Sequence, residues 1–290
     1  PILTLVSAKL DSGTNPLKAL QLGFQTILCA PGFLYLKEDE GNLSSNALAS
    51  RLSYFLWSSI PDDELIQIAQ SKSLNEPEIL HAQVDRMLDH PKAQRFVRNF
   101  IRVWLELDNI GRMPPSPDFR NYYRDDLGTA MQIETEHFFS HLLHQNLPLQ
   151  EFLTADFSFL NRELAKHYGI SGIEGSHFRK VTLPNSTRGG ILGHGSFLTA
   201  SANGVDTSPV IRGIYVMNKL LDYTPPPPPD DVPEIEPDVR GTITLRQQLI
   251  KHRADPSCAQ CHDKIDPAGF ALENYDAIGS WRDHYPDKLP

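Results

Sequence analysis

Apolar side chains recur every three or four residues along most of the first 170 residues, the spacing that gathers them on one face of an α-helix. Ser44, Ser45 or Asn46 is expected to cap an early helix, Pro61 to begin the next one and Gly169 to close the last. The helices predicted from this pattern cover residues 45–60, 61–70, 76–88, 91–107, 122–146 and 160–170.

Beyond residue 170 the helical spacing is lost for a stretch. Residues 171–209 are rich in Gly, Ser, Thr and Asn, and predict loops with one or two short strands. Helical spacing returns at 207–221, where Thr207 or Ser208 is expected as the cap and Pro209 lies in the first turn. The apolar stripe expected to pack in the core consists of Ile211, Ile214, Met217 and Leu221.

Five consecutive prolines at 225–229 predict a stiff polyproline II segment. No basic residue flanks them, so a surface spacer is favoured over a docking motif for a proline-binding partner. A last helix is expected over 244–257, leading into a cysteine-containing motif and then a compact loop at 263–282. These patterns together predict a mainly α fold: a helical body followed by a loop-rich carboxy-terminal domain.

Composition narrows the function classes. The chain of 290 residues carries a formal net charge of -9, which disfavours binding to a nucleic-acid backbone. No apolar run reaches the length of a membrane-spanning helix. Because the chain opens at Pro1 without a methionine, we expect it to be a piece of a longer protein.

Three cysteines are too few for a disulfide scaffold. Cys29 lies in an apolar stretch and is expected to be buried. Cys258 and Cys261 are separated by two residues and followed directly by His262, the spacing of a c-type haem attachment site, in which both thiols bond to haem and the imidazole ligates iron. The aromatic residues that follow would either line the haem pocket or fill a small core.

Three other interpretations of the cysteine motif stay open. A structural zinc site needs a second Cys or His pair, but His252 and His284 are single residues on either side. A thioredoxin-like redox pair needs a βαβ context, which the helical lead-in does not provide. A chance occurrence is the weakest alternative.

Several stretches in fixed order resemble one family: RLSYFLWSSIPDDELIQIA, ADFSFLNRELAKHYGI, RGGILGHGSFLTASANGVDTSPVIRGIYVMNKLL with PPPPPDDVPEI, and CAQCHDKIDPAGFALENYDAIGSWR. The family comprises large extracytoplasmic proteins, abundant in planctomycetes and related bacteria, built from adjoining domains of unknown function. Many members also carry a planctomycete-type cytochrome c module nearer the amino terminus. The chain is similar to the carboxy-terminal half of such proteins.

The resemblance implies one covalent haem c per chain, attached at Cys258 and Cys261 with His262 on the iron, and a periplasmic or otherwise extracytoplasmic location. The resemblance assigns no established activity. The chain's own patterns predict three segments: a helical domain at 1–172, a Gly/Ser-rich part with one helix and a polyproline linker at 173–240, and a cytochrome c-like haem-binding segment at 241–290.

The sixth iron ligand is open, because no methionine follows the motif. His252, which matches a histidine that the family has shortly before the motif, and His194, flanked by glycines, rank nearly level. Met217 is third, and an open site is a further alternative.

Other candidate groups are weaker. His137, His141 and His144 share one helix face and could hold a metal, but a solvated or half-buried face is favoured. Glu134 and Glu136 could act as acid and base, but are expected to be exposed.

Three function classes follow. The first is electron transfer to or from a redox partner protein or a neighbouring cytochrome domain of the parent chain. The second is a haem enzyme, such as a peroxidase or an oxidative enzyme acting on an external substrate, which needs an open or displaceable iron position. The third is a binding or scaffold module in which haem is secondary.

Overall fold

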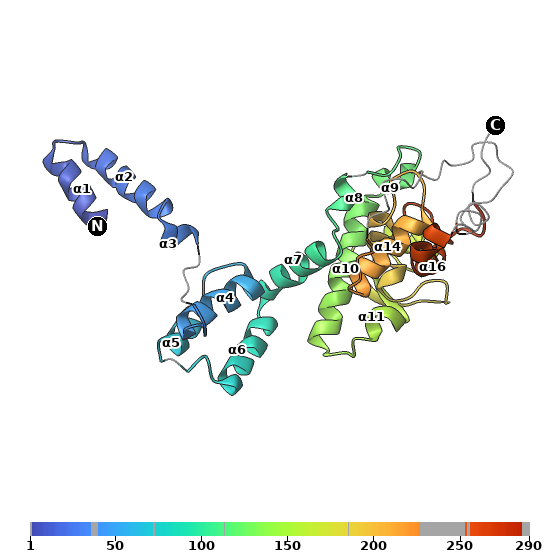
Figure 1. Cartoon of the computed structure of the whole chain (residues 1–290), viewed down its shortest axis with the longest axis horizontal. Coiled ribbons are helices and arrows are strands. Elements are labelled where there is room, and N and C mark those ends of the chain that lie inside the picture. Colours follow the sequence, from blue (N-terminus) through green and yellow to red (C-terminus); the bar gives the residue numbers. More distant parts are fainter. Residues whose placement is uncertain are drawn as a thin grey trace. The chain divides into compact units, whose positions relative to one another are not determined.

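The computed structural model describes residues 2–35, 40–71, 73–112, 114–184, 186–226, 253 and 256–285. The chain forms two compact units, one up to Phe96 and one from Val97 onward, so the boundary falls inside helix α7 (Gln94–Trp104) (Figure 1). Both units are built mainly from helices, which confirms the predicted mainly α fold with a loop-rich carboxy-terminal part. Within the described ranges, no helix is long and apolar enough to cross a membrane.

The first unit contains short and medium helices joined by tight turns. Its core surrounds Trp57, which is 1% exposed and donates its indole N–H to the carbonyl oxygen of Met87 at 2.9 Å. The elements are α1 (Ile2–Asp11), α2 (Pro16–Leu28), α3 (Pro31–Leu34), α4 (Ser45–Trp57), α5 (Asp63–Gln70), α6 (Pro77–Asp89) and the 3-10 turn η1 (Pro91–Ala93).

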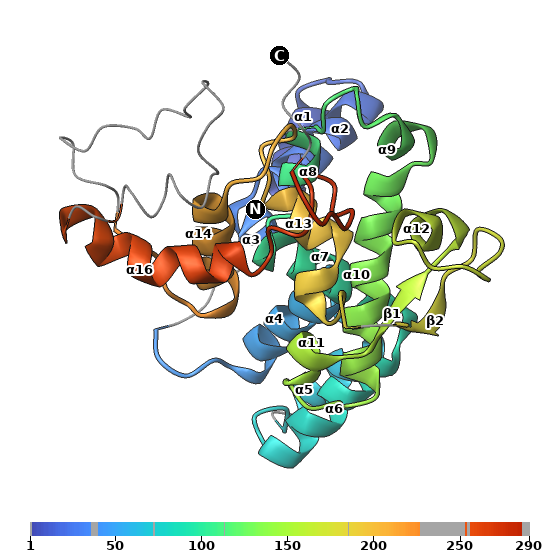
Figure 2. The ribbon, with the colours of Figure 1, turned by 90° about the vertical axis from the view of Figure 1, so that its right-hand side faces the viewer.

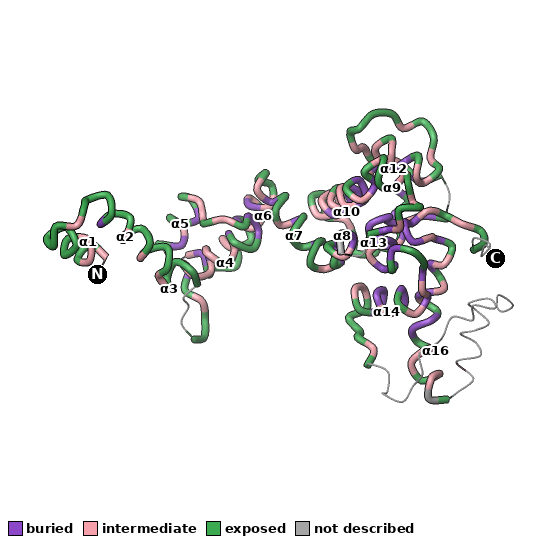
Figure 3. The backbone as a smooth tube through the Cα atoms, turned by 90° about the horizontal axis from the view of Figure 1, so that it is seen from above, coloured by how far each residue is buried: buried purple, intermediate pink, exposed green. Residues whose placement is uncertain are grey.

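Two predictions for this unit are wrong in detail. Helix α5 begins at Asp63, not Pro61, because the Asp62 side chain accepts the N–H of Leu65 and caps the helix. Cys29 is exposed rather than buried, since it follows α2 in a part of the chain where few side chains are covered (Figure 3). The predicted cap of α4 is confirmed at Ser44, which accepts the N–H of Ala47.

The second unit is organised around α10 (Leu127–His144), which buries both apolar and polar side chains. The antiparallel pair β1 and β2 lies against α10, with Phe157 opposite Thr182 and Leu160 opposite Arg179 (Figure 2). Its elements after α7 are α8 (Asn109–Arg112), α9 (Arg120–Arg124), α10 (Leu127–His144), α11 (Glu151–Thr154), β1 (Phe157–Leu160), α12 (Arg162–His167), β2 (Arg179–Thr182), η2 (Ile191–Gly193), α13 (Gly195–Ala200), α14 (Pro209–Leu220) and α16 (Pro256–Phe270).

The single long helix predicted over 122–146 is instead two helices, α9 and α10. Asp126 separates them with a left-handed backbone, φ 48°, a conformation that Asp tolerates better than most residues. Tyr122 of α9 folds back so that its ring covers Gly128, where a Cβ would collide with the phenol. The spacing of apolar residues does not reveal this contact, because it depends on how α9 folds back onto α10.

Helices α14 and α16 cross at very short range (Figure 2). A Cβ at Gly213 of α14 would collide with the carbonyl oxygen of Ile265, and one at Gly269 of α16 would collide with the carbonyl oxygen of Pro209. The two backbones therefore touch at glycines.

This crossing overturns two predictions. The loop expected from residue 263 is helical as far as Phe270, despite Pro267, because the packing against α14 holds the final turn. The expected core stripe of α14 is wrong at two of its four positions: Met217 is 7% exposed, as expected, and Ile214 is partly buried, but Ile211 is 50% and Leu221 63% exposed. Arg212, which was not expected in the core, is fully buried. The polyproline segment from residue 227 and the predicted helix at 244–257, up to Asp255, lie outside the described residues, Arg253 apart.

Candidate functional site

The cysteine motif lies in the first two turns of α16. Cys258 and Cys261 are both partly exposed free thiols. Residues three apart on a helix lie on the same side and about 5–6 Å apart at Cβ, so both thiols face one potential ligand. His262 follows on the next position, with 15% of its side chain exposed.

The His262 ring is oriented by a carboxylate one helical turn further on. Its Nδ1 lies 2.9 Å from Oδ1 of Asp266, a side chain with no exposed surface. The other oxygen, Oδ2, lies 3.6 Å from Nε of Arg253. With Nδ1 held by the carboxylate, Nε2 is the nitrogen suited to a metal, the arrangement common among metal-bound histidines. Asp266 was not among the predicted site residues, although it lies four residues after His262, one helical turn away.

These residues fit a covalent haem. The donor set offers two accessible thiols and one imidazole whose tautomer is set by a carboxylate. A structural zinc site needs four protein ligands. Across the ranges that the structure describes, no group of three or more His, Cys, Asp or Glu side chains could hold a metal ion by itself.

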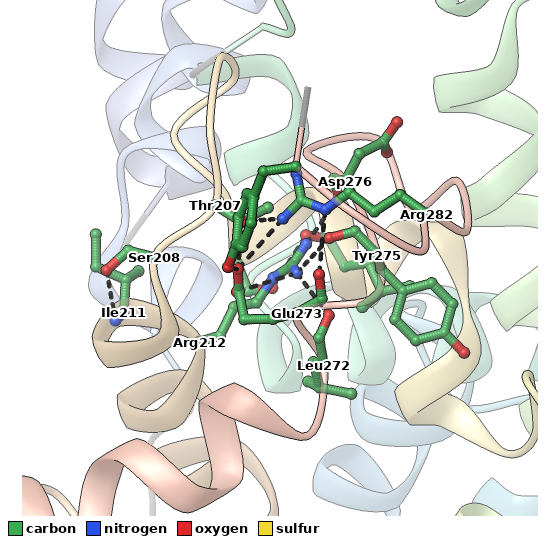
Figure 4. Close-up of polar contacts among 12 residues, drawn as sticks. Thr207, Ser208, Ile211, Arg212, Leu272, Glu273, Tyr275, Asp276 and Arg282 are labelled. Carbon is green, nitrogen blue, oxygen red and sulfur yellow. Dashed lines mark hydrogen bonds and ion pairs between the residues drawn. The ribbon is translucent and has the colours of Figure 1, made fainter. Parts of the chain in front are cut away.

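A buried arginine anchors the loop that follows α16 (Figure 4). Arg212 of α14 is fully buried and donates to the carbonyl oxygens of Leu272, Tyr275 and Asp276 at 2.7–2.8 Å. Its nearest carboxylate is Glu273, at 3.5 Å. Burial lowers the pKa of Arg212 to about 10, an effect that the charge of Glu273 opposes.

Glu273 is the second centre of this network (Figure 4). One of its oxygens, Oε2, accepts hydrogen bonds from Thr207, Arg282 and Tyr285 at 2.6–3.2 Å. These contacts join the start of α14 to the segment after α16. The motif helix is thus held at its carboxyl end by charge-assisted hydrogen bonds and along its length by the crossing with α14.

His194, one candidate for the sixth ligand, lies at the start of α13 and is 2% exposed. Its Nδ1 is 3.0 Å from the hydroxyl of Thr135, and its ring packs edge-on against Phe138, with centroids 4.7 Å apart; both partners belong to α10. Burial lowers the pKa of His194 to about 3, so the ring is neutral. Nε2 is buried and has no hydrogen-bond partner in the described part of the chain.

Met217, the third-ranked candidate, is 7% exposed and belongs to α14, the helix that packs on the motif helix. The close contacts pair Pro209 with Gly269 and Gly213 with Ile265, an antiparallel register. Four residues correspond to about one helical turn. One turn beyond Gly213 on α14 and one turn before Ile265 on α16, Met217 lies opposite Cys261. His252 lies outside the described residues. By this register Met217 comes level with the motif, whereas His194 contacts Thr135 and Phe138 of α10.

Glu134 was predicted to be exposed, and this prediction is wrong, because its side chain is fully buried. Its oxygens accept hydrogen bonds from the hydroxyls of Ser158 and Tyr168, each at 2.6 Å. Desolvation raises the pKa of Glu134 to about 7, although these hydrogen bonds act in the opposite direction. The overlooked signal was its place between Ala130 and Phe138, four residues from each on the buried face of α10.

Tyr168 connects this carboxylate to the segment around His194. Its hydroxyl accepts the backbone N–H of Gly195 at 2.7 Å, and the guanidinium of Arg188 lies 3.6 Å from its ring centroid. Burial raises the pKa of Tyr168 well above its ordinary value, so the phenol stays protonated and remains a donor to Glu134. The network is built to hold α10, α12 and α13 together.

The three histidines of α10 form a surface face, as favoured from the sequence. His137 is exposed and stacks between the rings of Phe159 and Phe178. His144 is also exposed, and its Nδ1 lies 2.7 Å from the carbonyl oxygen of Ser140. His141, which is half-buried, has its pKa lowered by burial and by the charge of Lys180. These contacts give each ring a structural role.

No curated protein and no solved structure matches the chain significantly. Two family models do match. Residues 43–170 match PSD4, described as a protein of unknown function (DUF1592), and residues 188–285 match PSCyt3, also described as a protein of unknown function (DUF1588). The second match includes the cysteine motif, α14 and the Arg212 network. The chain is therefore similar, over these two ranges, to adjoining domain families of unknown function, of the planctomycete-type, cytochrome c-like group that its motifs resemble.

Proposed function

We propose that this chain is an extracytoplasmic c-type haem protein that transfers electrons within a larger multidomain redox protein. One haem is attached through Cys258 and Cys261, and His262 ligates its iron. The observation that carries the proposal is the cysteine motif on one side of α16, with two partly exposed free thiols followed directly by His262. The PSCyt3 match, whose name fits a cytochrome, covers the same residues.

The chain's own groups have defined tasks in this proposal. Each thiol would add across a vinyl C=C bond of the haem: sulfur would bond to one carbon and the hydrogen would go to the other, so the addition would need reduced cysteines and no oxidant. His262 would hold the iron through Nε2, with Asp266 holding the proton at Nδ1. The bound haem supplies an iron that gains or loses one electron. The Arg212 and Glu273 network keeps the segment after α16 against α14.

The attachment is tested by intact-protein mass after expression in a host with haem-attachment machinery. The mass should exceed the sequence mass by one haem, and the double variant Cys258→Ala, Cys261→Ala should lose that excess. Cys29→Ala is the matched control, because Cys29 is an exposed lone thiol and should not affect loading. An unmodified wild-type mass from such a host would refute the proposal.

Absorption spectra test the sixth ligand and the choice between carrier and enzyme. We propose histidine ligation or an open position, because no methionine follows the motif. Met217, which the register of α14 and α16 puts level with Cys261, is the rival ligand. If the proposal holds, the near-infrared band of methionine-ligated ferric haem should be absent. His194→Ala or His252→Ala should then give a high-spin ferric spectrum. If both stay low-spin while Met217→Ala becomes high-spin, methionine is the ligand.

A haem enzyme is the second candidate, and the contact between Asp266 and His262 favours it, because a carboxylate on the proximal histidine increases electron donation to iron. A wild-type protein that is already high-spin and reacts with peroxide would place this function first. Partners and location follow from the main proposal: a redox protein or a cytochrome domain of the parent chain, outside the cytoplasm. Fractionation of the full-length protein into the cytosol would contradict that location.

A further inference from the structure

Asp266 is an unusual residue for the interior of a helical protein. Its side chain is fully buried, and a buried carboxylate is costly unless hydrogen bonds and opposite charge compensate it. Oδ1 contacts Nδ1 of His262 at 2.9 Å, and Oδ2 faces Nε of Arg253 at 3.6 Å without a hydrogen bond. Among the described residues the carboxylate is therefore only partly compensated, and its one close hydrogen-bonding contact there is with the motif histidine.

We infer that Asp266 is a positioning residue that fixes the tautomer of His262 and strengthens it as an iron donor. This inference rests on the proposed haem. With Nδ1–H donated to the carboxylate, negative charge is shared onto the ring and Nε2 donates more strongly. A stronger donor stabilises ferric over ferrous iron and lowers the reduction potential.

The nearby charges lead to an internal control. Asp263 lies on the same helix and pairs with Arg253 at 3.5 Å, but its side chain is 66% exposed. Replacing either aspartate by asparagine removes one negative charge from α16. Only the change at Asp266 removes the charge from the group that contacts His262, so the two variants separate the effect of a charged acceptor on His262 from a general charge effect.

The alternative is that Asp266 only stabilises the helix through its i,i+4 contact with His262. A stabilising pair would affect unfolding but would leave the electronic properties of bound iron unchanged. Two measurements separate the roles: the reduction potential from a spectroelectrochemical titration, and the ferric electron paramagnetic resonance spectrum, whose g values respond to the donor strength of an axial imidazole.

The experiment uses haem-loaded wild type, Asp266→Asn, Asp266→Glu and Asp263→Asn, with loading checked by mass. Asp266→Asn should shift the potential upward and change the g values. Asp266→Glu, which keeps the charge, should return both toward wild type, and Asp263→Asn should change them much less. A loaded Asp266→Asn protein with wild-type potential and g values, or an equal shift in Asp263→Asn, would overturn the inference.

A second measurement keeps the inference testable if the Asp266→Asn protein does not load. Nitrogen-15 NMR of the His262 ring in the wild-type chain before loading should show the proton on Nδ1, and a proton on Nε2 alone would overturn the inference. The two proposals fail separately. Wild-type protein without haem contradicts the proposed function, whereas loaded variants with unchanged potential contradict only the role of Asp266.

Discussion

Replacing Glu134 by glutamine should make the second unit more stable than wild type at alkaline pH. The carboxyl is fully buried, and burial raises its pKa from 4.5 to about 7. A group whose pKa is raised on folding binds its proton more tightly in the folded state. Proton binding to Glu134 therefore adds to the free energy of unfolding at low pH. That contribution is lost as the pH rises from 4.5, the pKa in the unfolded chain, through about 7, the pKa in the folded chain.

The size of this effect follows from the shift. A difference of roughly 2.5 pKa units corresponds to about 3 kcal/mol, because each unit is worth about 1.4 kcal/mol. Most of that change, about 2–3 kcal/mol, should fall between pH 5 and pH 8. Glutamine is neutral at every pH and resembles the protonated acid, so it can still contact Ser158 and Tyr168.

The assay is urea unfolding at several pH values, compared as the difference between Glu134→Gln and wild type. His194 has a lowered pKa and therefore destabilises the folded chain as the pH falls below 6.5, opposite to the effect of Glu134. Because wild type and variant share this effect of His194, it cancels in the difference between their free energies of unfolding. Glu136→Gln is the matched control on the same helix, since Glu136 is partly exposed and pairs with the exposed Arg98. A difference that stays constant from pH 5 to pH 8, or that falls with rising pH, would refute the reasoning.

Two further stability predictions concern the packing around the motif helix. Arg212→Met should reduce the free energy of unfolding, measured by urea titration, by about 3 kcal/mol or more. The reason is that Glu273 and three carbonyl oxygens lose a fully buried hydrogen-bond donor. A loss below about 1 kcal/mol would contradict this prediction. Gly213→Ala should cost about 2 kcal/mol and lower the melting temperature, since its Cβ would collide with the backbone of Ile265. Gly32→Ala, where a Cβ meets nothing, is the control, and equal effects at both glycines would count against the close crossing.

Local signals in the chain predicted much of the secondary structure correctly. Ser44 and Ser208 each cap a helix where the spacing of apolar residues begins, because capping depends on hydrogen bonds within a few residues. Gly169, with φ +72°, ends α12 for the same local reason. Where two local signals competed, as at Pro61 and Asp62, the side-chain cap of Asp62 prevailed.

The candidate site was only partly predictable. Cys258, Cys261 and His262 lie within five residues, so the motif could be identified from spacing alone. Its place inside a helix was not predicted, because the lead-in helix was expected to end at residue 257, whereas α16 runs from Pro256 to Phe270. Asp266 could have been found as the residue one turn further on, but its burial depends on α14 and its neighbours.

The amino-acid sequence by itself determines the periodicity of the helices and their caps, because these depend on contacts within one or two turns. It also contains the spacing of the cysteine motif directly. Burial of polar groups depends on segments far apart in the chain. Glu134 is enclosed by Ser158 and Tyr168, and Arg212 by the segment that follows α16 more than fifty residues later. Only the tertiary structure could decide that these charged side chains lie inside, because the free energy of burying them is set by partners that meet after folding.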